Sequence, residues 1–217
     1  MKIKTKKSGS YQKILVFAIL LCSTLVTNAQ TNEIIERIST ANLKVTSITA
    51  GFNQVRHIAF MEGDVKSNGS FYYTKPDKLA MKYTKPEDDL MLLSGEEFVM
   101  IANGRYSKRS IKQNSNVSQI QNILSSCLQG DVKKMNTSEL KQLENATQYI
   151  ITAKLNKTQG NAIEQVIVSY DKKDMTLSSL QTIEADGSYT LYILEGKKLN
   201  TTIDESVFTA PERQTKK

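Results

Sequence analysis

The sequence predicts a mostly β (α+β) fold, in which a curved or barrel-like antiparallel sheet has helices packed on it. Two blocks of short strand-like segments are separated by turn residues, one helical segment precedes the first block, and another lies between the blocks. Turns this short cannot make the crossover connections of a parallel sheet, so the strands are expected to pair antiparallel. Helices beside such a sheet favour the α+β arrangement.

The first predicted helix begins with Glu33 in its first turn, after Thr31 and Asn32, which are residue types that cap helix N-termini. Apolar residues then recur at helical spacing, and these are Ile34, Ile35, Ile38, Ala41 and Val45. One face of this helix is therefore expected to pack against the sheet, while the opposite face meets solvent.

The first β block has five predicted segments, at residues 51–60, 69–75, 78–84, 90–93 and 97–102. Side chains alternate between the two faces of a strand. The residues that share a face are Phe71, Tyr73 and Lys75 on the second segment, and Leu79, Met81 and Tyr83 on the third. Segments 90–93 and 98–101 are instead apolar on both faces, which predicts that they are covered from both sides.

The predicted meander ends near Gly104 in a polar, basic stretch that extends to Asn116. A second amphipathic helix follows, whose apolar residues are Ile120, Ile123, Leu124, Cys127 and Leu128. Gly130 is placed to end this helix, because glycine favours the position after a helix C-terminus. The segment around Leu140 and Leu143 is compatible with a further short helix or with a loop.

The second β block has predicted segments at residues 148–155, 162–170, 176–183 and 189–194, with a closing strand near 198–203. Asp186-Gly187 is typical of a tight hairpin turn between two of them. No internal repeat or low-complexity linker interrupts the chain, so residues 30–217 are expected to form a single domain.

The N-terminus has the pattern of a cleavable signal peptide at residues 1–29. Five lysines without an acid precede an apolar run at residues 14–26, which is shorter than the roughly twenty residues of a membrane-spanning helix. Small residues near Ala29 predict cleavage before Gln30. Lipid attachment at Cys22 is a less favoured alternative, because two bulky leucines precede this cysteine.

Charge and cysteine content narrow the class of partner. The chain has 29 basic and 22 acidic residues, but the leader holds five of the basic residues and none of the acidic ones. The mature part is therefore close to neutral and has no basic stripe interleaved with aromatic residues, which argues against nucleic acid as a partner. Only Cys127 remains after cleavage, so no internal disulfide is expected.

Neither an enzymatic site nor a cofactor or metal is predicted. The chain has one histidine, His57, and lacks a glycine-rich phosphate loop, a nucleophile elbow and a His/Cys cluster with metal-ligand spacing. A lone histidine without an evident orienting partner is expected on the surface. Cys127 lies on an apolar stripe and is expected to be buried and unreactive. The acidic trio at residues 87–89 follows a proline and predicts a solvated turn rather than a calcium site.

Several short motifs, taken in their order and spacing, resemble the LolA family of periplasmic lipoprotein carriers. In the first half they are Phe52-Asn53-Gln54, residues 69–76 (GSFYYTKP), residues 78–86 (KLAMKYTKP) and Ser94-Gly95. In the second half they are Asp186-Gly187 with the strand that follows, residues 198–200, Phe208 and Ala210-Pro211. The resemblance thus spans nearly all of the mature chain.

The resemblance implies an incomplete antiparallel β-barrel with helices covering its concave side, around an apolar cavity for acyl chains. It also implies a monomeric periplasmic protein that receives lipoproteins from an inner-membrane lipoprotein-releasing transporter and passes them to an outer-membrane acceptor. The expected lipid-cavity residues are Phe71, Tyr73, Leu79, Met81, Tyr83, Leu92 and Met100. The expected lid helix contributes Ile120, Ile123, Leu124 and Leu128.

Three departures from the family pattern concern the lid and the cargo. In the family an arginine ties the closed lid to backbone carbonyls, and Lys75 occupies this position as the expected latch. Lysine keeps the charge but lacks the planar five-donor fork, so a weaker or different latch is expected. Met81 replaces a tryptophan and Ser94 replaces an aspartate, which leaves the lipid and the loading partner open.

Three functions remain in competition. The first is a carrier of acylated lipoproteins, and the second is a carrier of another lipid or a glycolipid on the same fold. The third is a non-transporting envelope sensor or interaction module, since a fold does not fix a function. The residues assigned to the cavity are equally compatible with an ordinary core, because cavity lining and core share one apolar pattern.

Overall fold

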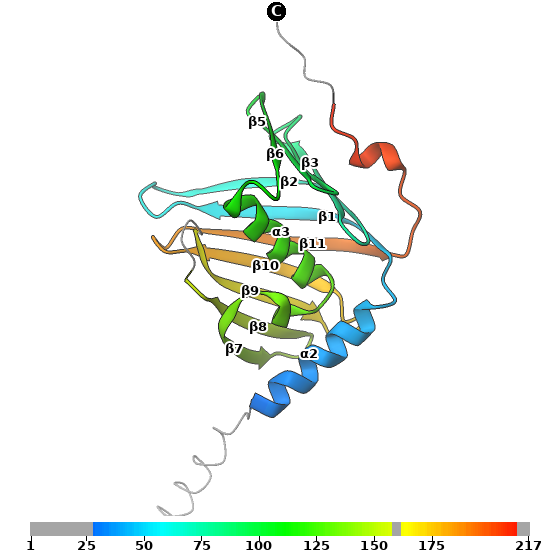
Figure 1. Ribbon diagram of the computed structural model, residues 1–217, viewed down its shortest axis with the longest axis vertical. Helices are drawn as coiled ribbons and strands as arrows, with labels where there is room; N and C mark the ends of the chain where they lie inside the picture. Colours follow the sequence, from blue (N-terminus) through cyan, green and yellow to red (C-terminus); the bar gives the residue numbers. More distant parts are fainter. Residues whose placement is uncertain (1–27, 158–161, 212–217) are drawn as a thin grey trace, which may run out of the picture.

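The structure is a computed structural model that describes residues 28–157 and 162–211 (Figure 1). The predicted signal peptide up to residue 27 and the basic tail at residues 213–217 lie outside the described residues. The helices are α2 (Asn28–Asn42) and α3 (Ser115–Leu128), and two short 3-10 turns are η1 (Val132–Lys134) and η2 (Glu205–Phe208). The strands are β1 (Ser47–His57), β2 (Asp64–Thr74), β3 (Lys78–Lys85), β4 (Leu90–Ser94), β5 (Glu97–Ala102), β6 (Arg105–Ser110), β7 (Thr137–Glu144), β8 (Gln148–Leu155), β9 (Ile163–Asp171), β10 (Leu177–Glu184) and β11 (Tyr189–Leu199).

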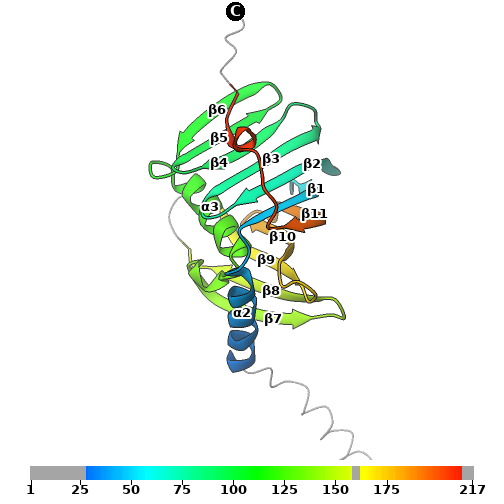
Figure 2. The ribbon, with the colours of Figure 1, turned by 90° about the vertical axis from the view of Figure 1, so that its right-hand side faces the viewer.

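All eleven strands of the described chain form one antiparallel sheet in the order β6-β5-β4-β3-β2-β1-β11-β10-β9-β8-β7. Strands β6 and β7 are its edges and do not pair with each other among the described residues. The sheet is curved, α3 crosses its concave side, and α2 contacts β7 (Figures 1 and 2). The predicted incomplete antiparallel barrel, with helices over its concave side, is therefore confirmed.

The pairing register gathers the predicted apolar faces on the concave side of the sheet. Phe71 lies opposite Met81, and Tyr73 lies opposite Leu79, in the β2–β3 pair. Met81 in turn lies opposite Met91 of β4. Together with the apolar stripes of α2 and α3, these side chains form one buried core. The helices are therefore held to the sheet chiefly by the burial of apolar surface.

Strand β4 is buried on both faces, as the sequence predicts. Met91 and Leu93 face the helices, whereas Leu92 packs on the outer face in a cluster with Phe208 of η2. Figure 2 shows the C-terminal segment, in red, passing over this outer face, where η2 contacts β3 and β4. The prediction that Leu92 lines the cavity is therefore wrong. A strand that is apolar on both sides offers no alternation from which its faces can be assigned.

Three β segments differ from their predicted form. The basic stretch after Gly104 is strand β6, and the segment around Leu140 and Leu143 is strand β7 rather than a short helix or loop. Both are edge strands, in which charged residues replace the apolar alternation of an inner strand. The last two predicted strands are one strand, β11, because Gly196 at φ +61° lies where the pairing with β1 shifts through a bulge.

Element ends also differ from the predicted ones by a few residues. Helix α2 begins at Asn28, ahead of the predicted caps at Thr31 and Asn32, and β1 starts at Ser47 rather than at residue 51. The second predicted helix is confirmed as α3. The side chain of Asn114 caps it, since its Oδ1 accepts a hydrogen bond from the backbone N of Val117 at 3.1 Å.

Candidate functional site

The candidate site is the concave face of the sheet together with the two helices that cover it. On α3, Ile123, Leu124 and Leu128 are buried, and Ile120 is half-buried against the same core. The side chains therefore lie on the stripe that the sequence predicts for a lid helix. These α3 side chains fill the space in front of the strands.

The ends of α3 and α2 are in direct contact at Gly130. This residue has φ +70°, and a Cβ atom added to it would lie 2.8 Å from Cγ2 of Ile38 and 3.0 Å from the carbonyl oxygen of Ile38. Only glycine fits both the backbone conformation and the space. The two helices thus form one connected cover over the sheet.

Lys75 fastens the end of α2 rather than the predicted lid helix. Its Nζ donates hydrogen bonds to the carbonyl oxygens of Asn42 at 2.6 Å and of Leu43 at 3.3 Å. The last carbonyls of a helix lack partners within the helix and carry partial negative charge, so a lysine here is favourable. Burial lowers the pKa of Lys75. Like the expected latch, Lys75 binds backbone carbonyls, but these carbonyls lie at the end of α2 and not on the predicted lid helix.

Further hydrogen bonds attach both helices to the strands. The Nδ2 of Asn42 donates to the carbonyl oxygen of Met175 at 2.7 Å, in the turn between β9 and β10. The hydroxyl of Tyr170 on β9 donates to the carbonyl oxygen of Cys127 on α3 at 2.9 Å. In the first contact the helix supplies the side chain, Asn42 of α2, whereas in the second the helix supplies only a backbone carbonyl, that of Cys127.

Most of the predicted cavity residues are core residues in this state. Phe71, Tyr73, Leu79 and Met81 are each only 2 or 3% exposed and share one core with the helices. Burial raises the pKa of Tyr73 to about 12. A ligand can therefore reach these side chains only if the helical cover, and α3 in particular, moves away from the sheet.

Tyr83 and Met100 line a pocket of about 280 Å³ at the open end of the concave face. Its lining residues are Gln54, Arg56, Val65, Ser67, Tyr83, Pro86, Asp89, Leu90, Met91, Met100, Ile101, Ala102, Asn103, Thr190 and Tyr192. The Tyr83 hydroxyl donates to Oε1 of Gln54 at 2.8 Å, and the Tyr83 ring packs edge-on against Phe52. Burial raises the pKa values of Tyr83 and Tyr192. This pocket is lined by both polar and apolar side chains, and we call it the open-end pocket.

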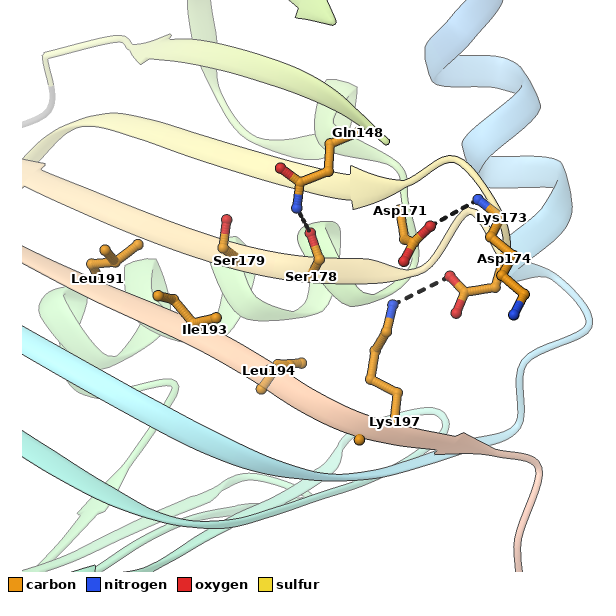
Figure 3. Close-up of a pocket in the computed structure, with 11 residues that line it drawn as sticks. Gln148, Asp171, Lys173, Asp174, Ser178, Ser179, Leu191, Ile193, Leu194 and Lys197 are labelled. Atoms are coloured by element: carbon orange, nitrogen blue, oxygen red, sulfur yellow. Dashed lines mark hydrogen bonds and ion pairs between the residues drawn. The ribbon is translucent and has the colours of Figure 1, made fainter. Parts of the chain in front are cut away.

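A larger pocket of about 650 Å³ lies on the opposite, outer face of the sheet. Figure 3 shows α3 behind the strands that carry it. Ser179 lies opposite Ile193 in its floor. At its rim Lys197 is paired with Asp174, with 3.2 Å between Nζ and Oδ1. This charged pair and the polar side chains around it (Figure 3) suit an acyl chain less well than the helix-covered face does.

His57 has a partner that sequence reasoning missed. Its Nδ1 lies 2.9 Å from Oδ1 of Asp64, and its ring stacks on Tyr189. The partner comes from the facing strand, where Asp64 is paired in register with His57.

Cys127 is fully buried, as predicted, and burial raises its pKa to about 12. Of the acidic trio, Asp89 accepts a hydrogen bond from the backbone N of Asn103 at 2.8 Å.

The polar side of the open-end pocket was also missed by sequence reasoning. Gln54 and Arg56 come from β1, whereas Thr190 and Tyr192 come from β11, and the β1–β11 pairing places Gln54 opposite Tyr192. The available signal was the alternation along β1, which puts Phe52, Gln54 and Arg56 on one face. Among residues 28–157 and 162–211, no cluster of histidine, cysteine or acidic side chains has the geometry to hold a metal ion.

The fold has similar solved structures at low sequence identity. An uncharacterized conserved protein from Thermus thermophilus has a TM-score of 0.51 at 10% identity, with 86% of this chain and 96% of that one covered. A DUF1329 family protein from Desulfovibrio piger has a TM-score of 0.50 at 9% identity, covering 83% and 96%. The MucA/MucB complex from Pseudomonas aeruginosa has a TM-score of 0.49 at 7% identity, covering 84% and 61%. These likenesses concern the fold alone.

No curated protein is similar enough to the chain to be matched to it. Within the described residues, neither α2 nor α3 combines the length and the apolar character that crossing a bilayer requires.

Residues 43–211 match the family described as outer membrane lipoprotein carrier protein LolA. This match includes all eleven strands and α3. The chain therefore belongs to the LolA family.

Proposed function

We propose that this chain is a periplasmic carrier that shields the acyl chains of lipoproteins against the concave face of its sheet. The supporting observation is the cover itself, because an apolar sheet face lies beneath two helices whose docking is largely apolar. Displacement of α3 exposes Phe71, Leu79 and Met81 as a binding surface. An inner-membrane lipoprotein-releasing transporter loads the carrier, and an outer-membrane acceptor receives the cargo.

The energetics require such a cover. At about 0.8 kcal/mol per buried CH₂ group, a long acyl chain in water costs on the order of 10 kcal/mol, so a carrier must hide it. The empty carrier must in turn hide its own apolar face, and the stripe on α3 does this in the structure. When an acyl chain replaces the helix, the buried apolar area stays similar, so the free-energy difference between the empty and the loaded state is expected to be small and both uptake and release are possible.

Replacing Lys75 with methionine is expected to loosen the cover. The variant loses both hydrogen bonds to the end of α2, and we expect the free energy of unfolding to fall by about 1–2 kcal/mol. Uptake of a fluorescent acyl probe should become faster, because the closed state is destabilised. Lys75→Arg serves as the control, since it keeps the charge and the donors. Equal uptake rates for Lys75→Met and the wild type would contradict a latch role.

The proposal is tested by native mass spectrometry, with lipid extraction, of the mature protein purified from its own envelope. Bound acylated lipoprotein is the expected result. A different bound lipid would replace the lipoprotein cargo with the second candidate, a carrier of another lipid or a glycolipid. Recovery of protein without any acyl species would contradict both and favour a sensor or interaction module.

One observation favours the second candidate. The open-end pocket places Gln54, Tyr83 and Tyr192 beside Arg56, and a carrier of plain acyl chains has no need of such a group of polar side chains. This observation bears on the head group of the cargo rather than on its tail.

A further inference from the structure

The open-end pocket has one wall that presents hydrogen-bond donors and a second wall that is largely apolar but carries Asp89. The donor wall consists of Arg56 on β1 and Tyr192 on β11, and the Tyr83 hydroxyl faces it from β3 through its bond to Gln54. Met91 and Met100 line the apolar side. A pocket of this kind fits a molecule with one polar end and one apolar end.

The donor wall carries the positive charge of Arg56. Within the described residues, Arg56 takes part in no ion pair. Its guanidinium is close enough to favour the charged forms of both Tyr83 and Tyr192. Guanidinium groups match carboxylate and phosphate oxygens in a planar, two-point geometry. The donor wall therefore favours an oxyanion.

The negative charge in the pocket lies on its other wall. Asp89, between β3 and β4, disfavours the charged form of Tyr83, and its Oδ1 accepts a hydrogen bond from the backbone N of Asn103 at 2.8 Å. An oxyanion is thus expected to lie toward β1 and β11, away from Asp89. This placement leaves the Met91 and Met100 side free for the beginning of a tail.

We propose that the open-end pocket binds the oxyanion head group, carboxylate or phosphate, of an amphiphilic cargo through Arg56 and Tyr192. This inference rests on the second candidate function, a carrier of another lipid or a glycolipid, and names the chemistry of the cargo's head. A pocket of about 280 Å³ is at the lower limit of ligand pockets, so it holds a head group and only the start of an acyl chain. The rest of the tail enters the space that α3 occupies in the structure.

The test compares binding of dodecyl phosphate, dodecanoate and dodecanol to the mature protein by competition against a fluorescent acyl probe. We expect the affinity for each anion to be at least about tenfold higher than the affinity for dodecanol, because charge-assisted hydrogen bonds to Arg56 form only with the anions. In Arg56→Gln this preference should fall to about twofold or less, while the affinity for dodecanol stays unchanged.

Lys66→Gln is the matched control. Lys66 lies on β2, opposite Val55, and is exposed on the outer face of the sheet. This variant removes the same charge from a neighbouring strand and should keep the full preference for the anions. A similar loss in Lys66→Gln and Arg56→Gln would show a general charge effect and overturn the site.

Two further outcomes separate this inference from the carrier function on which it rests. Equal binding of all three probes to the wild type would overturn the head-group site and leave the carrier function intact. Binding of none of them would contradict the carrier function itself. Displacement of dodecyl phosphate by an equal concentration of inorganic phosphate would mean a free-anion site without a tail, and would also overturn the inference.

Discussion

The thiol of Cys127 is expected to react with iodoacetamide about a thousandfold more slowly in the native protein than in the unfolded chain. Cys127 is fully buried on the face of α3 that meets the sheet. Its reaction therefore requires α3 to open, and an opening free energy of ~4 kcal/mol corresponds to a retardation of about a thousandfold. The labelling rate is measured by mass spectrometry on the mature chain.

Loading should reverse this protection. A triacylated lipopeptide that displaces α3 is expected to accelerate labelling of Cys127 by about tenfold or more, because the thiol leaves its apolar surroundings. An unacylated peptide of the same sequence is the control and should leave the rate unchanged. Unchanged labelling at saturating lipopeptide would mean that cargo binds without moving α3.

The same thiol makes the closed state sensitive to alkaline pH. Burial raises its pKa from 9.0 to about 12, so the closed state binds this proton more tightly than the open or unfolded state. The stability contributed by the neutral thiol is complete below pH 9 and is lost as the pH rises from 9 toward 12. The loss is up to about 1.4 kcal/mol per pH unit. Cys127→Ala should show a weaker decline over this range.

Replacing Gly69 with alanine is expected to lower the free energy of unfolding by about 3 kcal/mol or more. This loss is at the upper end of the range for substitutions that overpack a buried site. A Cβ atom at this position would lie 2.1 Å from the carbonyl oxygen of Lys82 and 2.8 Å from Cα of Tyr83. Both are backbone atoms of the paired strand, so β2 and β3 must separate to accept it. Urea denaturation followed by circular dichroism measures the change.

Gly51 offers a matched control on the neighbouring strand. A Cβ atom there would lie 3.8 Å from the nearest atom, the carbonyl oxygen of Glu195, which is ordinary van der Waals contact. Gly51→Ala is therefore expected to change the free energy of unfolding by less than about 1 kcal/mol. Comparable losses for the two variants would contradict the role assigned to close strand approach at Gly69.

The inner strands and α3 were predictable because their side chains follow regular patterns. Leu79, Met81 and Tyr83 alternate on β3, and the stripe from Ile120 to Leu128 has helical spacing. Edge strands β6 and β7 were missed, because an edge strand is not obliged to alternate. The face of Leu92 was assigned wrongly, because its strand is apolar on both sides and the C-terminal segment that covers it lies far along the sequence.

The open-end pocket was out of reach for a different reason. Its donor wall is assembled by the pairing of β1 with β11, which brings Gln54 opposite Tyr192. Periodicity shows which residues share a face of one strand, but it does not show which distant strand lies beside it or in what register. The target of Lys75 was likewise unpredictable, because the carbonyls it binds belong to a helix end that folds back on the sheet.

The most direct test of the carrier function is site-specific photo-crosslinking in cells, with a small diazirine amino acid placed at Leu79 or at Leu92. Leu79 is 2% and Leu92 is 3% exposed, on adjacent strands of one sheet, but Leu79 faces the helices and Leu92 faces the C-terminal segment. We expect adducts carrying acyl chains at position 79 and none at position 92. Acyl adducts absent from position 79, or equally abundant at both positions, would contradict the carrier function.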